Sequence, residues 1–87
     1  MSLSDRAYLM KRALLRTLAE CGDYLLRESA LFEQATLKVD FLDPTLSELK
    51  SALRAAEAAQ LVLGIAAERD RKWKLTDAGR AWLAENP

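Results

Sequence analysis

Four basic side chains lie within residues 69–74, close to the C-terminal end of the sequence. They are Arg69, Arg71, Lys72 and Lys74, and one acidic residue, Asp70, accompanies them. Cationic side chains around a turn can contact the phosphate groups of a nucleic acid, which adds affinity without reading its sequence. Charges that alternate with apolar residues can also serve only to protect an exposed strand edge. Both interpretations are open, and this segment is the best binding candidate in the chain.

A second polar group lies on one side of a helix predicted over residues 44–59. The residues expected to face the core are Leu46, Leu49, Ala52, Leu53 and Ala56. The outer side then carries Ser47, Lys50, Ser51, Arg54, Ala55 and Ala58. In a DNA-binding protein such a helix enters the major groove, where small polar residues touch base edges and basic residues touch phosphates. This face has a single arginine and no asparagine or glutamine, so its direct reading of bases would be limited. The alternative to DNA binding is that this side of the helix is only exposed to solvent.

The sequence lacks the residues that most enzyme sites require. It contains no histidine, which is the commonest general base and a frequent metal ligand. Its one cysteine, Cys21, falls on the apolar side of a predicted helix and is expected to be a buried small hydrophobe. No glycine-rich phosphate loop is present. We therefore expect a binding protein and not an enzyme, with no cofactor and no metal ion.

Length and composition indicate one small globular domain over residues 1–87. The 13 basic and 13 acidic residues give a net charge of zero, which counts against a protein that coats DNA. A lone cysteine excludes a disulfide framework within the chain and favours a reducing compartment. Without a membrane-spanning or leader-like apolar run, we expect a soluble, cytoplasmic protein with no membrane contact.

Apolar spacing predicts a mostly helical α+β fold. The expected helices cover residues 5–21, 28–38, 44–59 and 77–85, a short strand covers 23–26, and hairpin strands cover 61–67 and 72–75 around a polar tip at 68–71. Spacing of three and four gives way to alternation after Ala59 and returns beyond Thr76. This switch in period predicts the hairpin.

Helix boundaries follow from capping residues. The first helix is expected to start near Ser4 or Asp5 and to stop at Gly22, which can adopt a left-handed conformation. On this helix Arg12 and Arg16 can pair with Glu20 at helical spacing.

The third helix has two possible starts. Pro44 can occupy its first position with Asp43 as the cap. Alternatively, Thr45 caps the helix and Glu48 completes a capping box. For the last helix, Thr76 or Asp77 is the expected cap. The sequence alone leaves these choices open.

Two local sequences carry a family resemblance. Residues 53–62 read LRAAEAAQLV, and residues 73–83 read WKLTDAGRAWL. With the predicted order of elements, they resemble the winged helix-turn-helix domains of bacterial and archaeal regulators. The resemblance implies that Leu75 enters the core, that Thr76 caps the closing helix, and that Gly79 lets this helix approach its neighbour.

The chain departs from that family in two places. Gln60 stands where family members usually have glycine, so this turn must close differently. The connection over residues 39–44 is longer than the usual tight turn, and we expect Phe41 and Leu42 to tuck into the core there. Both departures bear on how the domain would dock on DNA.

Two functions are consistent with these observations. The first is a small DNA-binding transcriptional regulator, a homodimer, with helix 44–59 in the groove of duplex DNA and the hairpin on phosphates. Exposed Tyr8 and Leu9 on the first helix are typical of dimer packing. The second is a protein–protein interaction module, which zero net charge and the long connection favour. We expect Trp73 and Trp82 to lie in the core or at a subunit interface.

Overall fold

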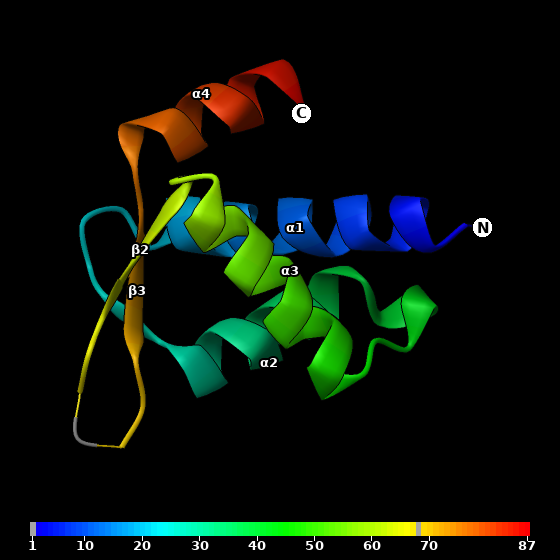
Figure 1. Ribbon diagram of the computed structural model, residues 1–87, viewed down its shortest axis with the longest axis horizontal. Coiled ribbons are helices and arrows are strands. Elements are labelled where there is room, and N and C mark those ends of the chain that lie inside the picture. The colour runs from blue at the N-terminus through cyan, green and yellow to red at the C-terminus, as the bar shows by residue number, and fades with distance from the viewer. Residues whose placement is uncertain (1, 68) are drawn as a thin grey trace.

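The computed structural model describes residues 2–67 and 69–87, so Met1 and Glu68, a residue of the predicted hairpin tip, lie outside the described residues (Figure 1). It shows a small α+β fold with four α-helices and a three-stranded antiparallel sheet. In chain order the elements are α1 (Leu3–Glu20), β1 (Leu26–Arg27), α2 (Glu28–Lys38), the 3₁₀ turn η1 (Asp40–Leu42), α3 (Leu46–Ala58), β2 (Val62–Ile65), β3 (Lys72–Leu75) and α4 (Asp77–Glu85). None of the described helices is long and apolar enough to cross a membrane.

The sheet is built around β3, which pairs with β1 on one side and with β2 on the other. The β2–β3 hairpin extends away from the helices in Figure 1. Trp73 in β3 lies opposite Leu26 on one side and Gly64 on the other. A Cβ atom on Gly64 would come 2.7 Å from the indole ring, so this strand position has room only for glycine beside the tryptophan.

The core lies among α1, α2, α3 and the inner face of the sheet. Its buried residues are Met10, Ala13, Leu14, Leu15, Leu18, Leu31, Phe32, Ala35, Val39, Leu42, Leu49, Ala52, Leu53, Ala56, Leu61, Val62, Trp73 and Leu75. All but one of the inward residues predicted for α3 lie in this core. Trp82 packs against it from α4 and is half-buried.

The first helix starts earlier than predicted. Ser2 caps it, with its hydroxyl accepting the Asp5 N–H at 3.2 Å and the Asp5 carboxylate accepting the Ser2 N–H at 3.4 Å. This reciprocal pair satisfies free amide groups at the helix start, so Ser4 lies inside the helix. Gly22 stops the helix with φ +63°, as predicted. Cys21 is only half-buried, contrary to the expectation of full burial.

The strands are shorter than predicted because pairing partners limit them. β1 covers Leu26–Arg27 and not residues 23–26, since only these residues face β3. β2 ends at Ile65, where its last partner is Lys72. Leu61 is still part of the turn after α3, because its N–H bonds to the Ala56 carbonyl at 2.9 Å. Gln60 closes that turn with φ 63°, in the left-handed conformation usually left to glycine.

The start of α3 differs from part of the prediction. Thr45 is the cap, while Asp43 has φ 48° and belongs to the preceding turn, so a helix starting at residue 44 is wrong. Leu46 is 57% exposed and Phe41 is 72% exposed, although both were expected in the core. Leu42 is the residue of this connection that enters the core, and it covers the end of the core near the start of α3.

The closing helix is joined to the hairpin through Thr76. Its hydroxyl accepts the Gly79 N–H at 3.0 Å and donates to the Gln60 carbonyl at 2.7 Å. Thr76 is therefore the cap, and Asp77 is the first helical residue. Gly79 is buried against Leu61 and Leu75, as the resemblance implied.

Candidate nucleic-acid interface

The first turn of α3 is fixed to α1 by a side-chain network. Thr45 and Glu48 form a capping box, in which the Thr45 hydroxyl accepts the Glu48 N–H at 3.1 Å. Arg6 of α1 donates to the Glu48 carboxylate from Nε at 2.9 Å and from Nη2 at 3.0 Å. A two-bond pair of this kind fixes orientation as well as position. It holds the start of α3 in one place relative to α1.

This network predicts a specific acid sensitivity. The Arg6 hydrogen bonds, followed by the Thr45 N–H, lower the pKa of the Glu48 carboxyl from 4.5 to about 2. A pKa that is lower in the folded state contributes stability that is complete above about pH 4.5 and is lost as the pH falls through about 2. Between these values we expect the free energy of unfolding to fall more steeply in the wild type than in Glu48→Gln.

Urea unfolding at a series of pH values would measure this difference. Glu33→Gln is the matched control, because Glu33 is exposed on α2 and no ion pair of the described residues includes it. The free energy of unfolding of Glu33→Gln, plotted against pH, should run parallel to that of the wild type. A Glu48→Gln curve that also runs parallel would contradict the role assigned to this carboxylate.

The outer face of α3 brings together the four residues predicted there. Ser47, Lys50, Ser51 and Arg54 are all exposed, and with Leu46 they surround a shallow hollow of about 320 Å³. Leu49 and Leu53 lie on the opposite, buried side of the helix. Helical spacing therefore predicted the direction of these side chains correctly, apart from Leu46.

The basic residues of the hairpin do not form one surface. Successive residues of a strand point to opposite faces, so Arg71 lies on the same side as the buried Trp73. Its guanidinium is 5.0 Å from the centre of that indole ring. Lys72 and Lys74 lie on the other face of β3, and Arg69 is exposed in the turn before it. The structure thus separates the predicted wing residues into two groups.

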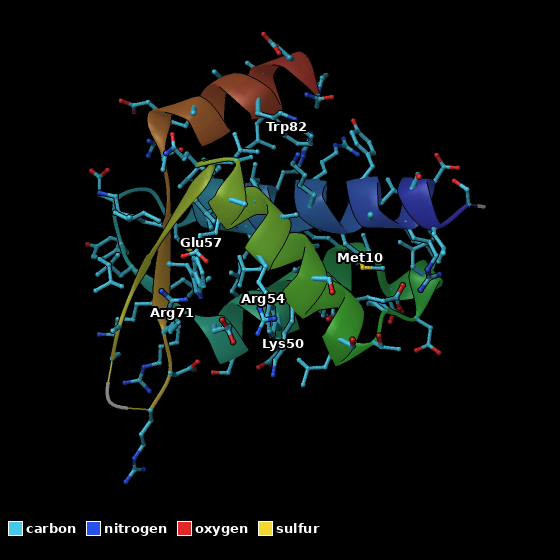
Figure 2. All side chains as sticks on the ribbon, viewed as in Figure 1. Met10, Lys50, Arg54, Glu57, Arg71 and Trp82 are labelled. Atoms are coloured by element: carbon cyan, nitrogen blue, oxygen red, sulfur yellow. The ribbon has the colours of Figure 1, made fainter. Side chains whose placement is uncertain are left out.

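Arg71 shares a hollow with the basic residues of α3. Lys50 and Arg54 from α3 and Arg71, the residue before β3, line a hollow of about 300 Å³ between helix and hairpin. Figure 2 shows Lys50, Arg54 and Glu57 along α3, with Arg71 across from Glu57. Nη2 of Arg71 is 3.6 Å from the Glu57 carboxylate. Three cations therefore line this hollow, and the charge of Arg71 is partly neutralised by Glu57.

Two acidic residues of this hollow were missed by the sequence reasoning. Glu57 follows Arg54 by one helical turn, so its position on the same side could have been read from the spacing. Glu28 accepts a hydrogen bond from Nε1 of Trp73 at 3.1 Å, and this contact depends on a pairing between residues far apart in the sequence. Both carboxylates reduce the positive potential of the interface.

The turn before β3 is held against the start of α2. The Asp70 carboxylate accepts from the Ser29 hydroxyl at 2.6 Å and from the Ser29 N–H at 3.2 Å. These bonds, the hydroxyl one above all, lower the pKa of Asp70. The Glu28 N–H also donates to the Arg71 carbonyl at 2.8 Å. The base of the basic segment is therefore anchored, which gives Arg71 a defined position.

Comparison of the chain with protein-family models, curated proteins and solved structures finds no match in any of them. What the interface binds must therefore be inferred from its own side chains.

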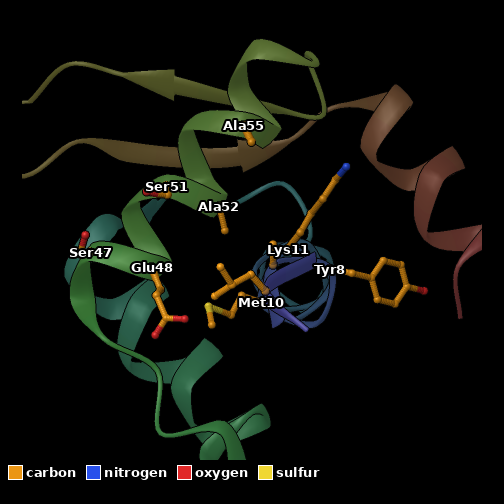
Figure 3. A pocket seen from close by; sticks show the side chains of 10 residues that line it. Tyr8, Met10, Lys11, Ser47, Glu48, Ser51, Ala52 and Ala55 are labelled. Carbon is orange, nitrogen blue, oxygen red and sulfur yellow. The ribbon is translucent and has the colours of Figure 1, made fainter. Parts of the chain in front are cut away.

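A larger, apolar groove lies on the other side of α3, against α1 (Figure 3). Its volume is about 510 Å³. Its lining consists of Leu3, Ala7, Tyr8, Met10 and Lys11 from α1 and Ser47, Glu48, Ser51, Ala52 and Ala55 from α3. Ser47 and Ser51 thus border both this groove and the outer hollow of α3. Nothing in the sequence pattern indicated this groove, because it depends on the spacing between two packed helices.

Proposed function

We propose that this chain is a winged-helix domain that binds duplex DNA, with α3 in the major groove and the β2–β3 hairpin as the wing. The order of helices and strands and the position of the hairpin next to α3 support the fold assignment. The observation that carries the functional proposal is the convergence of Lys50, Arg54 and Arg71 along one side of α3.

Each residue group has a distinct proposed role. Ser47 and Ser51 are exposed in the N-terminal half of α3, where a recognition helix touches base edges. Lys50, Arg54 and Arg71 contact phosphates, and Arg69 reaches the backbone from the turn. Lys72 and Lys74 lie on the far face of the hairpin and contribute less. With zero net charge and two carboxylates in the hollow, we expect modest affinity and a strong dependence on salt.

Fluorescence anisotropy with a mixed-sequence duplex at low salt tests this proposal. The variant Lys50→Ala/Arg54→Ala should weaken binding by about tenfold or more, and the slope of log affinity against log salt should become shallower by about 2, since two phosphate contacts are lost. Lys72→Ala/Lys74→Ala is the matched control, because it removes the same charge from the other face. Its effect should be several times smaller.

A third variant tests the ion pair within the hollow. Glu57→Gln removes the carboxylate beside Arg71 and should strengthen DNA binding, since the guanidinium becomes free for phosphate. No binding up to about 100 µM duplex would contradict the DNA proposal, because even non-specific binders reach that range. Equal losses in the two double variants would show that α3 is not the contact surface.

The second candidate function is a protein-interaction module, and the apolar groove between α1 and α3 favours it. A groove of this kind fits one apolar side of a helix, and Leu3 at its edge is 82% exposed. A second copy of this chain is the occupant we propose, because α1 itself offers exposed Leu3 and Tyr8 beside the groove. A monomer in sedimentation equilibrium at high protein concentration would contradict this homodimer.

A further inference from the structure

A hollow on the opposite side of α1 combines positive charge with apolar surface. It lies between α1 and the segment that follows α2, with a volume of about 330 Å³. Its lining residues are Leu9, Arg12, Ala13, Arg16, Lys38, Val39 and Phe41. At 100° per helical residue, positions 9, 12, 13 and 16 fall opposite positions 3, 7, 8 and 11, which face the groove toward α3. The hollow is therefore separate from that groove, and none of its lining residues lines the hollows of the proposed DNA interface.

The two arginines of this hollow, Arg12 and Arg16, form no ion pair with the described residues. Nε of Arg12 is buried and has no hydrogen-bond acceptor in the described part of the chain. Glu20 was expected to pair with Arg12 or Arg16, but it pairs instead with Lys38 at 2.6 Å. Arg16 is exposed and Arg12 is half-buried, so parts of both side chains remain open to a ligand. A carboxylate in the hollow could accept two bonds at once from one guanidinium.

The same hollow also presents an uncovered aromatic ring. Phe41 is 72% exposed, and it stands beside Leu9 and the buried Val39 at the edge of the cations. A simple anion would pair with the arginines but would leave this ring in water. A DNA phosphate backbone likewise offers charge without an apolar group. The chemistry that matches both features is a carboxylate close to a bulky apolar side chain.

We propose that this hollow binds an acidic segment of a partner protein, with one large apolar side chain against Phe41 and Val39. Carboxylates of the segment pair with Arg12 and Arg16. Because the hollow and the hairpin interface lie apart, the segment and duplex DNA can bind at the same time. The site is therefore an addition to the proposed DNA function and does not depend on it.

The probe for this site is a short synthetic peptide with a central phenylalanine flanked by glutamates on both sides. Titrated into the ¹⁵N-labelled protein, it should give saturable amide shifts around Leu9, Arg12 and Phe41. Peptides with alanine in place of phenylalanine, or glutamines in place of the glutamates, should each bind about tenfold more weakly. This loss corresponds to one charge-assisted hydrogen bond or one buried side chain.

Protein variants at exposed positions separate this site from the DNA interface. Arg16→Gln and Phe41→Ala are both on the surface, so they should fold normally and weaken peptide binding about tenfold, with duplex binding within about twofold of wild type. Arg54→Gln is the matched control. It should weaken duplex binding and leave peptide binding unchanged.

Three results would overturn the proposal. The first is the absence of saturable shifts up to about 1 mM peptide, and the second is a set of shifts centred elsewhere on the surface. The third is an Arg16→Gln variant that loses duplex affinity while keeping peptide affinity, which would assign the hollow to nucleic acid. Peptide binding in a protein that binds no duplex would support this site and contradict only the DNA function.

Discussion

Trp73→Ala is expected to lower the free energy of unfolding by about 3–5 kcal/mol, the usual range for truncating a buried aromatic residue. Trp73 is 2% exposed and lies on the central strand of the sheet. Its ring covers Gly64, and its Nε1 donates to Glu28 at the start of α2. Truncation removes one of the contacts that join the sheet to the helices and leaves a cavity between them.

A loss of this size is large for so small a domain, whose total stability is expected near the lower part of the range of about 5–15 kcal/mol. Chemical unfolding followed by circular dichroism would measure it. The loss should extend to function, because the ring of Trp73 also supports the guanidinium of Arg71. We therefore expect the Trp73→Ala protein to bind DNA weakly even at temperatures where it is folded.

Two controls test whether the effect comes from packing. Trp73→Phe keeps most of the buried ring but cannot donate to Glu28, so its cost should be only about 1–2 kcal/mol. Trp82→Ala removes a tryptophan that is half-buried between α4 and α1, and it should also cost less than Trp73→Ala. If Trp82→Ala proved the more damaging change, the assignment of Trp73 to the centre of the core would be wrong.

Gly79→Ala is expected to destabilise the protein by about 1–3 kcal/mol or more, the cost of overfilling a packed site. Helix propensity alone predicts the opposite, a gain of up to about 1 kcal/mol when glycine becomes alanine inside a helix. The added Cβ would meet the Leu61 carbonyl oxygen and lie 2.5 Å from Cδ1 of Leu75. The carbonyl is backbone and accepts the Thr76 N–H, so it cannot move aside cheaply.

Ala81→Gly on the same helix provides the matched comparison. Ala81 is exposed in α4, so this change should follow propensity and cost about 1 kcal/mol. Close packing at Gly79 therefore predicts that both substitutions lower the unfolding midpoint in urea. If Gly79→Ala instead raised the midpoint while Ala81→Gly lowered it, helix propensity would dominate, and α4 would not pack tightly on the turn before β2.

Residues close together in the sequence determined most of the secondary structure of this chain. Apolar spacing placed α2 over Glu28–Lys38, spacing and a capping residue placed α4 over Asp77–Glu85, and alternation placed β3 over Lys72–Leu75, as the structure has them. These features depend on contacts within one turn or on one strand, and such contacts can be read from residue types alone. The exposure of Lys50 and Arg54 followed from the same periodicity.

Only the tertiary structure decided which of these side chains share a surface. The sequence placed Arg71, Lys72 and Lys74 in one group. The pairing of β3 with its neighbours directs Arg71 toward Glu57 of α3, whereas the two lysines point to the other face of the hairpin. Whether Leu42 or Phe41 entered the core depended on how η1 closes the gap between α2 and α3. Both outcomes arise from contacts between segments distant in sequence, which no local pattern encodes.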